Sequence, residues 1–138
     1  MKDLRMRLLI VAVCLQITVV QAQTLQGIWT VEQITIEKNT NSRVDTTVYH
    51  SAAEVTGTIL CPDEWEINQD SIVWRYFRGG EAIFAYTLDG DQLTLNTVGA
   101  IHPYQYSMSG GKLILTIRYN VNNPPIHMDE KWIITLSK

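Results

Sequence analysis

Apolar and polar residues alternate along most of residues 27–137, and short turn signals interrupt the alternation about every ten residues. A period of two places successive side chains on opposite faces of a strand, so the pattern predicts β-strands. Only residues 50–55 have a composition that suits a helical turn. We therefore expect eight or more antiparallel strands in consecutive order. The clearest turn signals are Gly79-Gly80, Asp89-Gly90, Gly110-Gly111 and the segment 120–125.

The turn at Gly110-Gly111 allows the predicted register to be checked. With a two-residue turn, Ser109 pairs with Lys112 and the pairing continues outward along both strands. One face then receives apolar residues and the other mostly polar residues, as a sheet with one buried face requires. The apolar pairs are Met108 with Leu113, Tyr106 with Leu115, and Tyr104 with Ile117. A second hairpin, at Asp89-Gly90, is expected to pair Phe84 with Leu95 and Tyr86 with Leu93.

Strands without covering helices must bury their apolar faces against each other, in a sandwich or a barrel. Closing the sheet also removes the exposed edges that favour aggregation. We expect an all-β fold, a single antiparallel up-and-down (meander) β-barrel of eight or more strands, over residues 23–138. A barrel of this size is either filled by side chains or wide enough for one small ligand.

Residues 1–22 have the pattern of a cleavable signal peptide. Lys2, Arg5 and Arg7 form a positive segment, residues 8–20 are apolar, and Val20-Gln21-Ala22 is a small-residue cleavage pattern. We therefore expect the chain to be exported to the periplasm or the extracellular space and cleaved after Ala22. No other stretch approaches the roughly 20 apolar residues of a membrane-spanning helix, so no stable membrane insertion is expected.

Composition narrows the choice of partners. Removing the leader, with its three basic residues and Asp3, takes the formal net charge from −3 to −5, which argues against nucleic acid as a partner.

Cys14 lies inside the apolar part of the leader behind the bulky Val13, a setting that does not favour a lipoprotein anchor. Cys61 is then alone in the exported chain, which excludes an intramolecular disulfide but not a disulfide-linked dimer. Its neighbours Asp63 and Glu64 favour a protonated, unreactive thiol.

The segment Gly27-Ile28-Trp29 stands at the start of the first strand, behind a signal peptide and ahead of the run of strands. In this position a Gly-x-Trp motif resembles the lipocalin superfamily, and more narrowly the short lipocalin-like domains of secreted bacterial proteins. The family's Thr-Asp-Tyr signature is absent. The resemblance implies that Gly27 allows a close backbone approach and that Trp29 packs across the closed end of the barrel. It also implies a basic cover over the Trp29 ring, from Arg118 or Lys138.

We find no arrangement of residues that predicts catalysis, a cofactor or a metal site. His50, His102 and His127 are far apart and form no metal-binding spacing, and there is no nucleophile elbow or phosphate-binding glycine loop. The acidic residues Asp63, Glu64 and Glu66 have the pattern of a charged strand edge. The sequence therefore favours a protein that is not an enzyme.

Aromatic residues on the predicted strands suit the lining of a ligand cavity, although the same residues also suit a filled core. The candidate ligand-binding residues are Trp74, Phe84, Tyr86, Tyr104, Tyr106, Leu115, Trp132 and Arg75. Gly27 and Trp29 are expected to be structural.

The direction of Arg75 depends on the loop at Gly79-Gly80. A two-residue loop places Arg75 opposite Phe84 on the core face, where it can anchor a ligand carboxylate. A three-residue loop with a bulge reverses the parity and turns Arg75 to solvent, which avoids burying an uncompensated charge. The sequence leaves both registers open.

These observations predict a non-catalytic binding protein for a small apolar or amphipathic ligand in the barrel interior. The alternative is a barrel with a filled core that binds a protein or glycan through surface loops. The loops would then be residues 38–56 and 121–125, with solvent-facing aromatics such as Trp65 or Tyr119 marking the patch. The volume of the interior distinguishes the two hypotheses.

Overall fold

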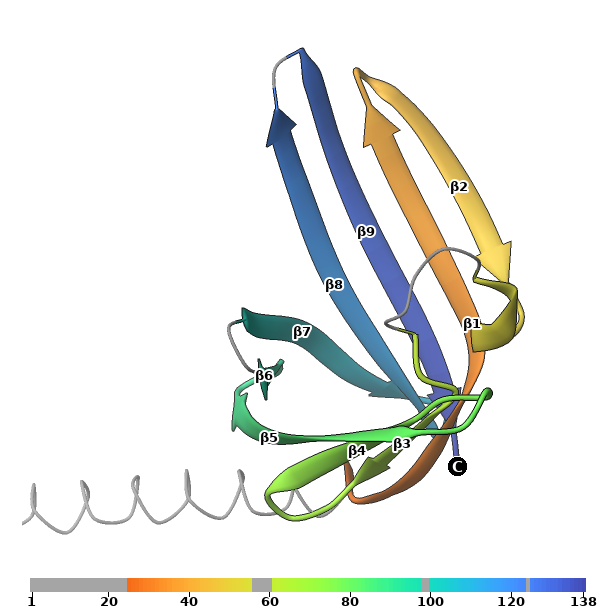
Figure 1. The fold of residues 1–138 in the computed structure, drawn as a ribbon, viewed down its shortest axis with the longest axis vertical. Helices are drawn as coiled ribbons and strands as arrows, with labels where there is room; N and C mark the ends of the chain where they lie inside the picture. Colours follow the sequence, from red (N-terminus) through yellow and green to blue (C-terminus); the bar gives the residue numbers. More distant parts are fainter. Residues whose placement is uncertain (1–24, 56–60, 98–99, 124) are drawn as a thin grey trace, which may run out of the picture.

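The computed structural model describes residues 25–55, 61–97, 100–123 and 125–138, and within these ranges the chain is almost entirely β-strand (Figure 1). A single 3-10 turn, η1, falls within the stretch expected to be helical. The elements are β1 (Gly27–Thr40), β2 (Arg43–Tyr49), η1 (Ala52–Glu54), β3 (Glu64–Ile67), β4 (Ser71–Arg75), β5 (Glu81–Asp89), β6 (Gln92–Thr97), β7 (Ala100–Ser109), β8 (Lys112–Asn123) and β9 (Ile126–Ser137).

The strands form a closed antiparallel barrel of eight strands, to which β2 adds one more. Closure depends on β1, which changes partners along its length. Its first part pairs with β3 from Gly27↔Ile67 to Thr30↔Glu64, and on its other edge it pairs with β9 from Thr30↔Ser137 onward. The expected fold class, an antiparallel barrel with consecutive strands next to each other, is confirmed. The hairpin strand β2 is the exception, because it lies outside the closed ring.

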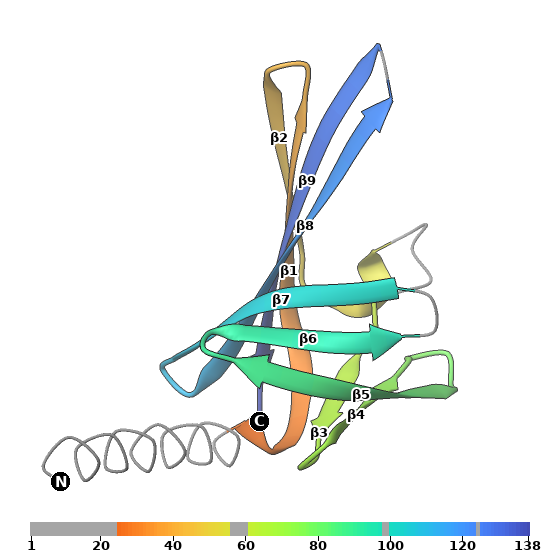
Figure 2. The ribbon, with the colours of Figure 1, turned by 90° about the vertical axis from the view of Figure 1, so that its left-hand side faces the viewer.

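Strands β1, β8 and β9 continue beyond the ring. Together with β2 they form a curved sheet in the order β2-β1-β9-β8, which we call the extension (Figures 1 and 2). It consists of residues 36–40, 43–47, 117–123 and 126–132. The extension arises because β7 pairs with β8 only as far as Gln105↔Thr116, while β8 and β9 stay paired to Asn123↔Ile126. We call the end of the barrel from which the extension projects the mouth.

The observed hairpins test the predicted registers. Between β7 and β8, Ser109↔Lys112, Met108↔Leu113 and Tyr106↔Leu115 are paired as expected. Between β5 and β6 the turn lies one residue later than predicted, so that Asp89 pairs with Gln92. Tyr86 therefore pairs with Leu95 rather than Leu93, and the predicted pairing of Phe84 with Leu95 is wrong. The shift of two residues keeps the same side chains on the core face, because the period of a strand is two.

Tightly buried aliphatic side chains fill the barrel toward the end that holds the first residues of β1. Ile34, Leu93, Leu95, Leu113, Leu115 and Leu136 are all 0% exposed. A close-packed core of this kind leaves no room for a ligand among these side chains.

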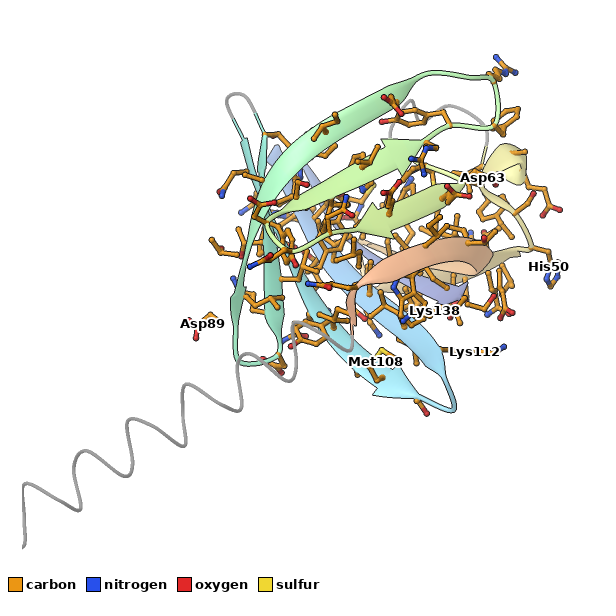
Figure 3. The ribbon with its side chains drawn as sticks, turned by 90° about the horizontal axis from the view of Figure 1, so that it is seen from below. His50, Asp63, Asp89, Met108, Lys112 and Lys138 are labelled. Carbon is orange, nitrogen blue, oxygen red and sulfur yellow. The ribbon has the colours of Figure 1, made fainter. Side chains whose placement is uncertain are left out.

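Trp29 is buried at this end of the barrel. Its ring is 1% exposed, and its Nε1 donates a hydrogen bond of 2.7 Å to the carbonyl oxygen of Leu25. The Lys138 ammonium lies 4.7 Å from the centroid of the Trp29 ring, so Lys138 rather than Arg118 supplies the expected basic cover. Lys138 is labelled in the view of the molecule from below (Figure 3). Gly27 has a φ of +132°, and a Cβ built there would lie 3.1 Å from Lys138 Cε. Both its backbone conformation and this close approach favour glycine.

The predicted signal peptide, residues 1–22, and Cys14 lie outside the described residues. Within the described part of the chain, no helix has the length and apolar character needed to cross a membrane.

Candidate functional site: an aromatic pocket at the barrel mouth

A half-enclosed pocket of about 190 Å³ lies at the mouth, where the extension leaves the barrel. Five segments contribute to it: the residues just before β3, and strands β3, β7, β8 and β9. Its position follows from the strand register, because Trp132 pairs with Ile36, well beyond Trp29 along β1. We call it the mouth pocket. Its lining residues are Cys61, Trp65, His102, Tyr104, Ile117, Tyr119, Glu130, Trp132 and Ile134.

Four aromatic rings dominate the mouth pocket and form two nearly perpendicular pairs. Trp65 and Tyr104 have ring centroids 5.5 Å apart at 89°, and Tyr119 and Trp132 have centroids 6.4 Å apart at 80°. Edge-to-face contacts of this kind are favourable because the electropositive edge of one ring meets the electronegative face of the other. The rings are thus held by one another as well as by their strands.

Trp65 also carries an unsatisfied polar group. Its side chain is 0% exposed, and within the described structure its Nε1 has no hydrogen-bond partner. Trp74, which packs on Trp65 with ring centroids 5.0 Å apart, has an unpaired Nε1 as well. A buried donor without an acceptor costs on the order of 1–3 kcal/mol. Such a group is unusual in a core that serves packing alone.

Glu130 is the acidic group of the mouth pocket. Its side chain is 19% exposed; the Trp132 Nε1 donates a hydrogen bond to Glu130 Oε1, and Lys38 Nζ lies 3.7 Å from Oε2. Strand pairing explains this arrangement, since Glu130 of β9 lies directly opposite Lys38 of β1 and Tyr119 of β8. Burial raises the pKa of the Tyr119 phenol, and the neighbouring Glu130 carboxylate raises it further. Tyr119 is therefore a neutral hydroxyl at physiological pH.

Cys61 contributes an inert thiol to the wall. It is 7% exposed, and burial, followed by the nearby Asp63 carboxylate, raises the pKa of Cys61 to about 12. A thiol that stays protonated is a poor nucleophile. The direction of the pKa shift is the one expected from the neighbouring carboxylates, and the burial of Cys61 disfavours an intermolecular disulfide.

Two of the predicted ligand-binding residues, Tyr104 and Trp132, line the mouth pocket. Trp74 packs behind Trp65, and Phe84 packs on Trp74 with ring centroids 4.7 Å apart. Trp74 and Phe84 thus support the pocket wall from outside the lining.

The other predicted lining residues serve the barrel itself. Tyr86 donates a hydrogen bond of 2.8 Å to the carbonyl oxygen of Asn68, and Tyr106 donates one of 3.0 Å to that of Gly90. Both phenols thereby satisfy carbonyls at strand turns. Leu115 is fully buried in the filled core.

Arg75 does not point into the barrel, which corrects its candidacy as an interior ligand anchor. The loop between β4 and β5 has five residues, 76–80, and pairs Arg75 with Glu81 on the outer face, while Ile72 pairs with Phe84 on the inner face. The side chains of β4 therefore alternate in the way expected for the three-residue loop with a bulge, which turns Arg75 to solvent. The Arg75 guanidinium forms ion pairs with Glu64, at 2.6 Å, and with Glu66 and Glu81. It accordingly holds the pKa of the Glu66 carboxyl below its usual value.

Sequence reasoning missed Trp65 as an inner residue and named it as a solvent-facing aromatic, which is wrong. The signal was present: Glu64-Trp65-Glu66-Ile67 alternates strictly, with Glu64 and Glu66 turned out to Arg75 and Trp65 and Ile67 buried. Because Asp63, Glu64 and Glu66 suggested a charged strand edge, the buried face of this strand was not recognised. Tyr119 is 38% exposed and lies at the pocket rim.

Glu130 and His102 were also missed. Glu130 lies two residues before Trp132 and therefore shares its face of β9, which is a signal that the period of two provides. His102 pairs with Leu95 of β6, and nothing in its local sequence indicates the pocket. No cluster of three or more metal-ligating side chains occurs among the described residues.

A second, more open hollow of about 390 Å³ lies on the extension. Its lining is polar and charged, and unlike the mouth pocket it contains no aromatic ring. The lining residues are Glu37, Asn39, Val44, Arg118, Asn120, Asp129, Glu130 and Lys131.

Comparison with known proteins finds no family model, curated protein or solved structure that matches this chain.

Proposed function

We propose that this protein is an exported, non-catalytic binding protein that holds a small amphipathic molecule in the mouth pocket. The observation that carries the proposal is the pocket's composition: four aromatic rings and one carboxylate surround a half-enclosed space of about 190 Å³. Small-molecule sites combine an apolar, aromatic lining with a few polar groups that fix orientation. The mouth pocket has this composition.

The size of the pocket limits the ligand. Sites that enclose drug-sized molecules have volumes of about 300–1,000 Å³. The mouth pocket is smaller and partly open, so it suits a compact group, with any longer part of the ligand projecting along the extension. The expected interior carrier site for a fatty acid does not suit this barrel, because the filled core occupies that space and Arg75 lies outside.

Two further features support a ligand here. The lining is mainly apolar and aromatic, and Glu130 adds one charged group to it. The Gly27–Trp29 closure with its Lys138 cover agrees with the lipocalin resemblance, a class of barrels closed at one end and open at the other.

The test is native mass spectrometry of the protein produced by export in bacteria from the full 138-residue chain, followed by identification of any adduct. Saturation-transfer NMR with 3,3-dimethylbutan-1-ol, a small neutral amphiphile, provides an independent probe. We expect a one-to-one adduct or alcohol binding that Ile117→Phe removes, because the larger side chain fills the pocket. Thr116→Phe is the matched control on the outer face of the same strand. Binding that is equal in both variants, or absent altogether, contradicts the proposal.

A second candidate function is binding of a protein or glycan by the extension. The observation that favours it is the projection of the β1–β2 and β8–β9 hairpins beyond the barrel (Figure 2). The polar hollow lies along these hairpins. Asn39→Ala combined with Asn120→Ala should weaken capture of such a partner and leave alcohol binding unchanged. The opposite result would assign binding to the mouth pocket alone.

A further inference from the structure

The charge and the aromatic residues of the mouth pocket indicate a class of ligand. This inference rests on the proposed function. We propose that the mouth pocket binds an organic cation, a small quaternary or tertiary ammonium group. The described lining residues include one carboxylate, Glu130, and no lysine or arginine. The formal charge of the lining is thus −1 when His102 is neutral.

The aromatic rings supply the second part of the argument. The face of an aromatic ring is electronegative, and a cation within about 6 Å of a ring centroid is attracted to it, most strongly by tryptophan. Tyr119 and Trp132 are the lining rings with the most exposed surface, 38% and 8%, and they are nearly perpendicular, whereas Trp65 and Tyr104 are 0% and 4% exposed. A compact ammonium group presents its methyl groups in all directions and suits such a lining. A flat or extended apolar ligand would use fewer of these faces.

Glu130 is placed to complete this site. Its Oε1 accepts the indole hydrogen bond of Trp132, which holds the carboxylate beside a ring of the pocket. Its partner Lys38 has a side chain that is 48% exposed, and exposed ion pairs of this kind are weak. Lys38 can therefore turn to solvent when a ligand cation approaches, and the carboxylate then pairs with that cation. The negative net charge of the chain favours the approach of cations over anions.

Choline and 3,3-dimethylbutan-1-ol form a matched pair of probes, because they have nearly the same shape and differ in the charge of one atom. Quenching of tryptophan fluorescence, checked by calorimetry, measures both affinities. We expect choline to bind about tenfold more tightly than the alcohol. If the alcohol binds as tightly as choline, the cation inference fails while the proposed function stands. If neither binds in a manner sensitive to Ile117→Phe, both fail.

Two charge variants should change the affinity for choline in opposite directions, and neither replaces a residue of the core. Glu130→Gln should weaken choline binding about tenfold and leave the alcohol nearly unaffected. Lys38→Met should strengthen choline binding a few-fold, because it removes a like charge near Glu130. The reverse pattern, with Lys38→Met weakening binding, would identify an anionic ligand and overturn the inference. Circular dichroism shows whether each variant is folded.

The cation could come from a free amine or from a lipid headgroup, and phosphocholine separates these sources. Binding as tight as that of choline indicates a headgroup whose phosphate projects out of the mouth. Loss of binding on adding the phosphate indicates a free ammonium compound, because the Glu130 carboxylate then repels the anionic group.

Discussion

Two tryptophans that pair across neighbouring strands, Trp29 of β1 and Trp65 of β3, have different environments. The Trp29 indole donates to a backbone carbonyl, lies under the Lys138 ammonium and is 1% exposed. The Trp65 indole has no hydrogen-bond partner among the described residues and belongs to the lining of the mouth pocket. The first tryptophan is fully satisfied by the fold, and the second is not. Under the proposed function, this difference separates a tryptophan that serves packing from one beside the binding site.

The largest expected effect is at the closed end. Trp29→Ala should lower the free energy of unfolding by about 3–5 kcal/mol, because it removes a buried ring and leaves a cavity. Thermal unfolding followed by circular dichroism measures this effect. A melting shift of only a degree or two would show that Trp29 does not hold the barrel closed.

Lys138→Met is the partner variant at this end, since it keeps the Trp29 ring and removes the ammonium above it. Its cost should be about 0.5–1 kcal/mol, the range of an exposed cation–π contact. A loss as large as that of Trp29→Ala would mean that the cover, and not the ring, provides the closure.

The filled core should respond nearly as strongly. Leu115→Ala should cost about 2–5 kcal/mol, because Leu115 is fully buried and close-packed. Ile114→Ala, the next residue on the same strand and only half-buried on the outer face, should cost clearly less. Urea denaturation of both variants compares the two faces of β8. Equal losses would contradict a core that lies on one face only.

A smaller effect is expected on the outer face at Arg75. The guanidinium lowers the pKa of Glu66 in the folded state, so its contribution to stability is present above about pH 4.5 and is lost as the pH falls through the lowered value. The melting temperature of the wild-type protein should therefore fall more between about pH 5 and about pH 3 than that of Arg75→Met. Arg78→Met, in the adjacent loop, is the control. Parallel curves for the wild type and Arg75→Met would show that the ion pairs do not stabilise the fold.

The smallest effect is expected in β2. Val44 and Val48 of β2 are 65% and 46% exposed and face away from the barrel. Val44→Thr and Val48→Thr should each change the free energy of unfolding by no more than about 0.5 kcal/mol. Backbone amides of β2 should also exchange with solvent before those of β6, which lies between two strands of the ring. A large loss at either valine would show that the outer face of β2 is covered.

Much of the ring follows from local pattern. Alternation and turn residues predicted the strands, and the Gly110-Gly111 turn predicted the β7–β8 register as observed. Residues on one face of a strand stay on that face whether the turn shifts by one residue or not, as the hairpin at Asp89-Gly90 demonstrates. The sequence also named Lys138 as one of two candidate covers of the Trp29 ring, and the structure places Lys138 there.

The sequence by itself determined which side chains share a face, because the period of a strand is a local property of the backbone. It did not determine which faces meet. Arg75 turned outward because the β4–β5 loop has five residues and three carboxylates surround the guanidinium on that side. The mouth pocket brings Trp65 of β3 together with Tyr104, Tyr119 and Trp132 of the consecutive strands β7, β8 and β9, which are distant from β3 along the chain. Only the closure of β1 on β3 and β9 decides that meeting, since it depends on long-range pairing that no local pattern encodes.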